Sequence, residues 1–142
     1  MTTAEQKTVQ NLCAFIDASP SPFHVVQTAA NQLATAGFTE IFTTSEAAGD
    51  HPVYLRRDGA LLAAAGTGTQ AAKIIGAHTD SPNLRLKPNP DQTASGWRSL
   101  GIEVYGGALN NTWLDRDLGC SGRLIVQDPD ALREVLVLLD RP

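Results

Sequence analysis

A short apolar run that ends in polar residues sets the fold class of this 142-residue chain. Residues 73–77 are apolar after their first lysine, and the run has the length of a buried, often parallel, strand. The polar segment 78–82 follows at once. Open α/β sheets bind ligands outside the carboxyl ends of their strands. The run therefore predicts an α/β sheet with a candidate site at its end.

His78 and Asp80 are the candidate site residues in this segment. Histidine binds a metal through one ring nitrogen while a carboxylate or carbonyl holds the other. In an extended segment, positions i and i+2 share a face, so both side chains can enter one cleft. We predict that His78 is a metal ligand and that Asp80 fixes its tautomer. The pattern alone also fits a hydrogen-bonded surface histidine, because a metal site needs three or four ligands.

The other histidines and the cysteines suggest no second site. His24 lies in the first turn of an expected helix, and we interpret it as structural. His51 precedes a proline in a loop and is expected to be exposed. Cys13 and Cys120 lack the spacing of metal ligands, and we expect reduced thiols that are buried or inert.

Two amphipathic helices are expected before the candidate strand. Residues 3–18 have apolar side chains at helical spacing, and Thr3 with Gln6 resembles a capping box. Ser21 is the expected N-cap of a second helix, and Gly37 ends it. Each helix has one apolar stripe that needs a sheet or another helix to cover it.

Strand signals surround these helices and dominate the end of the chain. Residues 38–42 are a weak candidate, and 53–56 and 60–65 flank a turn typical of a hairpin. Residues 66–69 are expected to form a loop. Residues 84–87 alternate in polarity, and residues 88–91, with two prolines, are expected to break that strand.

The later strands are expected at residues 101–105, 122–126 and 134–139, separated by glycine and Asp-Pro turns. Residues 1–88 are therefore predicted to be part of an α/β domain with helices on a mixed sheet. Residues 89–142 are predicted to begin a β-rich domain of different architecture.

A second signal lies in residues 105–118. Gly106 and Gly107 allow a close backbone approach, and residues 115–117 place an arginine between two aspartates. The segment fits either a loop that orders an active-site edge or subunit contact, or a turn with a local ion pair. It is no dinucleotide fingerprint, and the chain has no Gly-x-Ser-x-Gly motif or P-loop.

Composition excludes several classes of function. The net charge is −4 and no run of lysine or arginine is present, so nucleic acid is not an expected partner. The longest apolar runs are far shorter than the roughly 18 residues of a membrane span. The first residues lack the parts of a signal peptide. Together with two distant cysteines, these features favour a cytoplasmic protein.

Three blocks in this sequence resemble the aspartyl aminopeptidases. Residues 15–24 resemble the opening helix–turn–helix of that family. Residues 76–85, which contain His78 and Asp80, resemble the segment with its first zinc ligand. Residues 105–107, 112–118 and 122–123 resemble a third block, in the same order. The resemblance extends from about residue 9 to residue 142.

The resemblance implies a two-zinc aminopeptidase that removes Asp or Glu from the N-terminus of peptides. His78 would bind one zinc, and Asp80 would orient it. The family combines an α/β catalytic domain with a β-rich inserted domain used in assembly, and its members form large homo-oligomers. The family's bridging aspartate, general-base glutamate and remaining ligands match no residue here. The chain is therefore expected to be an incomplete N-terminal portion with at most a partial zinc site, inactive alone.

Two alternatives remain open. The chain fits a non-catalytic binding or assembly module that keeps the first half of the fold without its metal site. It also fits a different dinuclear hydrolase, such as a carboxypeptidase or deacylase, with the same His-x-Asp strand.

Overall fold

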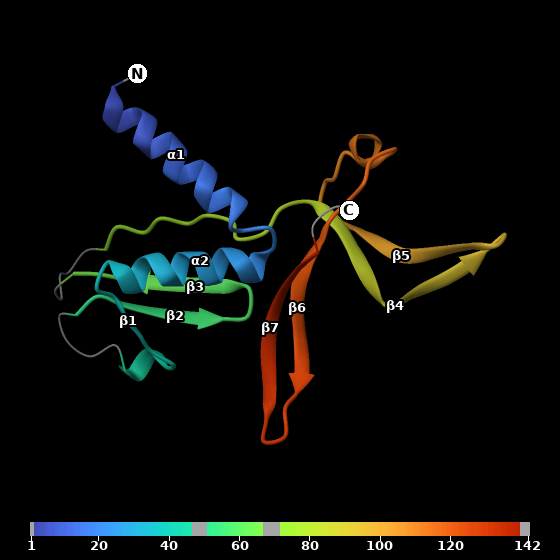
Figure 1. Ribbon diagram of the computed structural model, residues 1–142. Coiled ribbons are helices and arrows are strands. Elements are labelled where there is room, and N and C mark those ends of the chain that lie inside the picture. The colour runs from blue at the N-terminus through green and yellow to red at the C-terminus, as the bar shows by residue number, and fades with distance from the viewer. Residues whose placement is uncertain (1, 47–50, 67–71, 140–142) are drawn as a thin grey trace. The chain divides into compact units, whose positions relative to one another are not determined.

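The computed structural model describes residues 2–46, 51–66 and 72–139 (Figure 1). Contacts divide the chain into two compact units, one formed by residues 1–80 with 118–142 and the other by residues 81–117. Most of the loop predicted at residues 66–69 lies outside the described residues. Neither helix has the length and apolar character that a bilayer crossing requires, within the ranges described.

The first helix, α1, extends over Thr3–Asp17, as the sequence predicts. Its capping box begins one residue earlier than expected. The Thr2 hydroxyl accepts from the Glu5 backbone N–H, and the Glu5 carboxylate accepts from the Thr2 backbone N–H. No residue of α1 is buried, and its stripe residues Leu12 and Ile16 are 58% and 60% exposed.

The second helix, α2 (Pro22–Thr35), begins and ends where its sequence signals predict. Ser21 is the N-cap and Pro22 occupies the first turn, where its missing N–H needs no partner. Gly37 has φ +87°, a conformation that glycine adopts at little cost after a helix. Val26 and Ala30 are almost fully buried on the inner face of α2.

A three-stranded mixed sheet packs against α2 (Figure 1). The short strand β1 (Thr39–Glu40) pairs in parallel with β2 (Val53–Arg57), and β2 pairs antiparallel with β3 (Ala60–Ala64). A 3-10 turn, η1 (Thr44–Glu46), follows β1. Ile41 and Tyr54 complete the small buried core beneath α2. This arrangement confirms the mixed α/β fold class.

The prediction of a strand at residues 73–77 is wrong. The segment forms no helix or strand, and Ile74 and Ile75 are 91% and 95% exposed. A strand is stable only when a neighbouring strand satisfies its backbone N–H and C=O groups. No strand of the described residues pairs with this segment.

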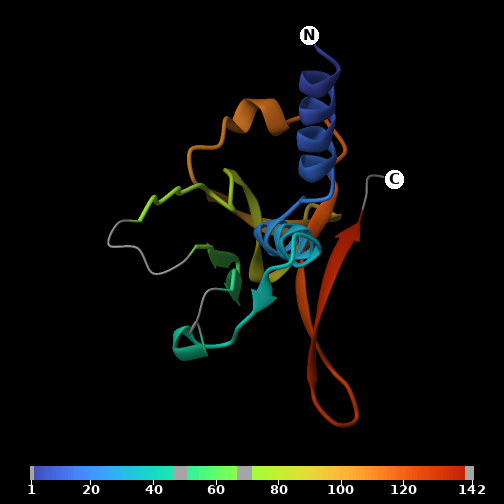
Figure 2. The ribbon, with the colours of Figure 1, turned by 90° about the vertical axis from the view of Figure 1, so that its left-hand side faces the viewer.

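The C-terminal hairpin belongs to the first unit. Strands β6 (Cys120–Gln127) and β7 (Leu132–Leu139) pair antiparallel and include the predicted strands at 122–126 and 134–139. Figure 2 shows α2 end-on, with the green strands β2 and β3 on one side and the red hairpin on the other. The Ser121 hydroxyl donates to the Pro20 carbonyl at 2.8 Å, which links the start of β6 to the loop before α2.

The second unit is a long hairpin followed by a 3-10 turn. Strands β4 (Asn83–Ala94) and β5 (Trp97–Tyr105) pair antiparallel, and η2 (Asn110–Trp113) follows. The break expected at residues 88–91 is a register shift between Leu86 and Asp91, because prolines donate no hydrogen bond to the ladder. The predicted domain boundary after residue 88 falls within β4 and stays a prediction.

Candidate metal centre

The structure brings the two predicted site residues together. His78 Nδ1 lies 2.9 Å from an Asp80 carboxylate oxygen, so the expected contact is present, although the backbone bends at Thr79 and does not run extended as the sequence argument assumes. The His78 side chain is 89% exposed, and that of Asp80 is 31% exposed. An exposed pair of this kind contributes little to folding stability. Its consequence is therefore the orientation of the imidazole.

Hydrogen-bond chemistry fixes which nitrogen of His78 faces a ligand. An ionised carboxylate only accepts, so Nδ1 must carry the proton that is shared with Asp80. In the neutral ring, Nε2 then keeps its lone pair, and the exposure of the side chain leaves that nitrogen open to solvent. This tautomer, with a carboxylate behind it, is the one that histidine uses as a metal ligand.

A third residue, which the sequence patterns did not single out, anchors this segment. Thr79, between His78 and Asp80, donates its hydroxyl to the Gly59 carbonyl in the β2–β3 turn, with an O···O distance of 2.6 Å. The contact is partly buried and joins positions 20 residues apart. No local sequence signal reveals it, because its acceptor is a backbone carbonyl in a distant turn.

The described residues supply one ligand position and not a complete zinc site. Imidazole nitrogen is a normal zinc ligand, and His78 presents one with its second nitrogen held. Zinc needs three or four ligands, and the described residues contain no group of three or more histidine, cysteine, aspartate or glutamate side chains that could hold a metal. Whether His78 binds metal stays a prediction.

The other histidines take the places expected of them. His24 Nδ1 lies 2.7 Å from the Ser21 hydroxyl in the first turn of α2, and burial lowers the pKa of its imidazole. His51 is exposed. Cys13 and Cys120 are free, but both are exposed, so the burial considered for them is wrong.

The glycine-rich segment of the second unit forms a turn. Gly106 has φ +70°, and a Cβ there would lie 3.4 Å from a Pro82 side-chain atom, so this glycine permits a close approach. Asp115 also has a positive φ, of +52°. The local ion pair considered for Arg116 is absent, since no salt bridge of the described residues involves it.

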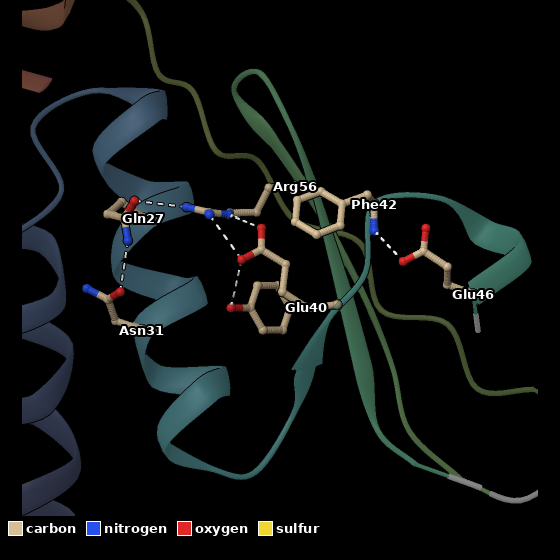
Figure 3. Close-up of polar contacts among 7 residues, drawn as sticks. Gln27, Asn31, Glu40, Phe42, Glu46 and Arg56 are labelled. Atoms are coloured by element: carbon tan, nitrogen blue, oxygen red, sulfur yellow. Dashed lines mark hydrogen bonds and ion pairs between the residues drawn. The ribbon is translucent and has the colours of Figure 1, made fainter. Parts of the chain in front are cut away.

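Two arginines line a groove of about 430 Å³ in the first unit, and each forms ion pairs with acidic side chains. Arg56 donates to both carboxylate oxygens of Glu40, at 2.6 and 3.0 Å, and to the Gln27 side-chain oxygen at 2.9 Å (Figure 3). The Glu40 hydrogen bond raises the pKa of Arg56 above its usual range. Arg123 is held by Asp58 and Glu134. Neither arginine therefore offers an uncommitted cation for a substrate carboxylate.

The family of this chain follows from a match over most of its length. The family model described as "Aminopeptidase I zinc metalloprotease (M18)" matches residues 15–142. The chain belongs to the M18 aminopeptidase family. It is 49% identical over 141 residues to "Probable M18 family aminopeptidase 2" of Mycobacterium leprae, with 93% of this chain and 33% of the relative covered. The predicted resemblance to metallo-aminopeptidases is thus confirmed.

Two solved mApe1 structures have the same fold over nearly the whole chain. The structure of Chaetomium thermophilum mApe1 matches with a TM-score of 0.77 and 32% identity, covering 94% of this chain and 33% of that one. The S. cerevisiae mApe1 dodecamer matches with a TM-score of 0.76 and 27% identity, covering 95% and 34%. The chain therefore spans about a third of the length of the relatives it matches.

Proposed function

We propose that this chain contributes one metal ligand to a two-zinc aminopeptidase that removes N-terminal Asp or Glu from peptides. The hydrogen bond between His78 and Asp80, in a chain of the M18 family, is the observation that carries the proposal. The description of the family as zinc metalloproteases supports the choice of metal.

Each residue of the pair has a separate task in this proposal. His78 binds one metal ion through Nε2, which the observed hydrogen bond leaves with its lone pair. Asp80 accepts from Nδ1–H, holds the ring in that tautomer and raises the basicity of the ligating nitrogen. When bound, the two zinc ions polarise the scissile carbonyl and lower the pKa of a bound water.

The remaining ligands and the general base have no counterpart in this sequence, so we propose that the 142-residue chain alone is inactive. The absence of a group of three potential ligands among the described residues supports this part. Zinc retained per chain, measured by elemental analysis after exposure to zinc, tests it. We expect little bound zinc and no effect of His78→Ala. Two retained zinc ions that His78→Ala removes would overturn the proposal of a partial site.

Acidic selectivity needs a test on the longest protein produced from the reading frame that contains this chain. We expect chelator-sensitive release of Asp and Glu from peptides, and a much slower release of Leu from otherwise identical peptides. A protein that prefers Leu would keep the metallo-aminopeptidase proposal and reject the acidic selectivity. A protein whose activity survives both a chelator and His78→Ala would reject the metal role of His78.

We further propose that the parent protein is a cytoplasmic homo-oligomer in which residues 89–142 take part in assembly. The dodecamer named for S. cerevisiae mApe1 supports the oligomer. The two free cysteines are compatible with a reducing compartment. Light scattering of the parent protein would test the oligomer, and a stable monomer would contradict it.

A non-catalytic binding or assembly module is the second candidate. It is favoured by the incomplete ligand set of the described residues. A reading frame that ends at residue 142 and yields a stable, cooperatively folded product without peptidase activity would support this candidate. A longer product with chelator-sensitive activity would reject it.

A further inference from the structure

We propose that Thr79 is a positioning residue of the metal centre, acting through the Gly59 carbonyl; this rests on the proposed role of His78 as a metal ligand. The segment that leads to His78 is exposed and forms no regular structure. The Thr79 hydroxyl, 2.6 Å from the Gly59 oxygen, ties it to the β2–β3 hairpin directly beside the ligand.

The direction of the Thr79 side chain explains how it acts on its neighbours. The backbone is not regular here and bends at Thr79. His78 and Asp80 contact each other on either side of this bend, whereas the hydroxyl of Thr79, at its centre, contacts Gly59. The threonine hydrogen bond therefore restrains rotation of the segment about its own axis. That rotation sets the direction of His78 Nε2.

The acceptor is itself held in place by two elements. Gly59 lies in the turn that joins β2 and β3, where Asp58 has φ +51°. A Cβ on Gly59 would lie 3.2 Å from the Pro22 Cβ, so the turn packs closely against the first residue of α2. The Gly59 carbonyl is thus fixed relative to the helix and the sheet that form the core.

Arg123 ties the C-terminal hairpin to the same turn. One of its terminal nitrogens, Nη1, donates to Asp58 and to Glu134, both at 3.1 Å. Its guanidinium carbon lies 4.3 Å from the centre of the Phe23 ring on α2. One side chain therefore joins β6, β7, α2 and the turn that accepts from Thr79. Arg123 therefore helps to hold the turn that contains Gly59.

Metal affinity measured on the protein as produced from the reading frame that contains this chain tests the proposal. The probe is Co²⁺, followed by its visible absorption and by competition with a chelator. We expect Thr79→Val, which keeps the shape and removes the hydroxyl, to weaken binding by about tenfold and to change the cobalt spectrum, as for loss of other groups that orient a ligand. Thr79→Ser restores the hydroxyl and is expected to bind within about twofold of the unmodified protein.

Thr35→Val is the matched control, because the Thr35 hydroxyl also donates to a backbone carbonyl, that of Asn31, at 2.8 Å, and it lies at the end of α2, outside both candidate site segments. It should leave the affinity and the spectrum unchanged. Unchanged binding in Thr79→Val, with binding lost in His78→Ala, would overturn the positioning role and leave the metal role of His78 intact. Unchanged binding in His78→Ala would overturn both. An equal loss in Thr79→Val and Thr79→Ser would also overturn the positioning role, because the hydroxyl would then be irrelevant.

Discussion

Ile74 and Ile75 should drive association of this chain through the segment that forms no strand. Their side chains are 91% and 95% exposed, and no strand of the described residues pairs with them. Full burial of an isoleucine side chain stabilises by about 1.5–3 kcal/mol. Because both side chains stay exposed in the monomer, roughly 3–6 kcal/mol of stabilisation by burial is not gained there. Contact that buries about half of their area would supply about 1.5–3 kcal/mol, or roughly 10- to 150-fold in a dissociation constant.

The perturbation is the double substitution Ile74→Ser and Ile75→Ser. Sedimentation velocity over a wide range of chain concentration measures the result. The unmodified chain should form oligomers of irregular size, because an exposed segment with unpaired backbone groups accepts strands from other copies. The double variant should shift the concentration at which oligomers appear upward by about 10- to 150-fold.

A control must separate this mechanism from general apolar exposure. Leu109 and Leu114 are both 70% exposed and flank the 3-10 turn η2, where no extended backbone is offered. Replacing both with serine should change association much less than replacing the isoleucines. The reasoning is refuted if the unmodified chain is a sharp monomer, or if both double variants reduce association equally.

Three further predictions concern the β2–β3 turn, which accepts the Thr79 hydrogen bond, and the imidazole of His24. Gly59→Ala should lower the hydrogen-exchange protection of the β2–β3 amides by about 1–3 kcal/mol, because the added Cβ would lie 3.2 Å from the Cβ of Pro22, whose ring is rigid. Unchanged protection would contradict the close packing of the turn. Arg123→Met should speed amide hydrogen exchange at the β2–β3 turn. The difference from the unmodified protein should shrink in high salt, because the Asp58 side chain that Arg123 binds is 74% exposed. Arg133→Met, which breaks an exposed ion pair in the β6–β7 hairpin, is the control. Burial lowers the pKa of His24 in the folded state below its ordinary value of 6.5, so the unfolded state takes up the proton at a higher pH. The free energy of unfolding should therefore fall as the pH drops from 6.5 through the folded-state pKa. An NMR titration that gives an ordinary or raised pKa for His24 would refute this prediction.

The local parts of this fold are the ones that the sequence predicts well. Ser21, Pro22 and Gly37 act within one turn of α2, so their effect depends little on distant residues. The turn at residues 57–59 likewise predicts the β2–β3 hairpin. The contact of His78 with Asp80 is also local, since only Thr79 separates the two residues, although the backbone bends there and is not extended.

Tertiary structure alone decides which apolar residues are covered and what anchors the candidate site. The pattern of residues 73–77 is that of a buried strand, yet it forms none here, because a strand exists only with a pairing partner and the described chain provides none. The acceptor of Thr79 lies 20 residues away in sequence, and Asp58, one partner of Arg123, lies 65 residues away. The residue order encodes spacing along the chain, whereas these contacts depend on how α2, the β2–β3 turn and the β6–β7 hairpin pack.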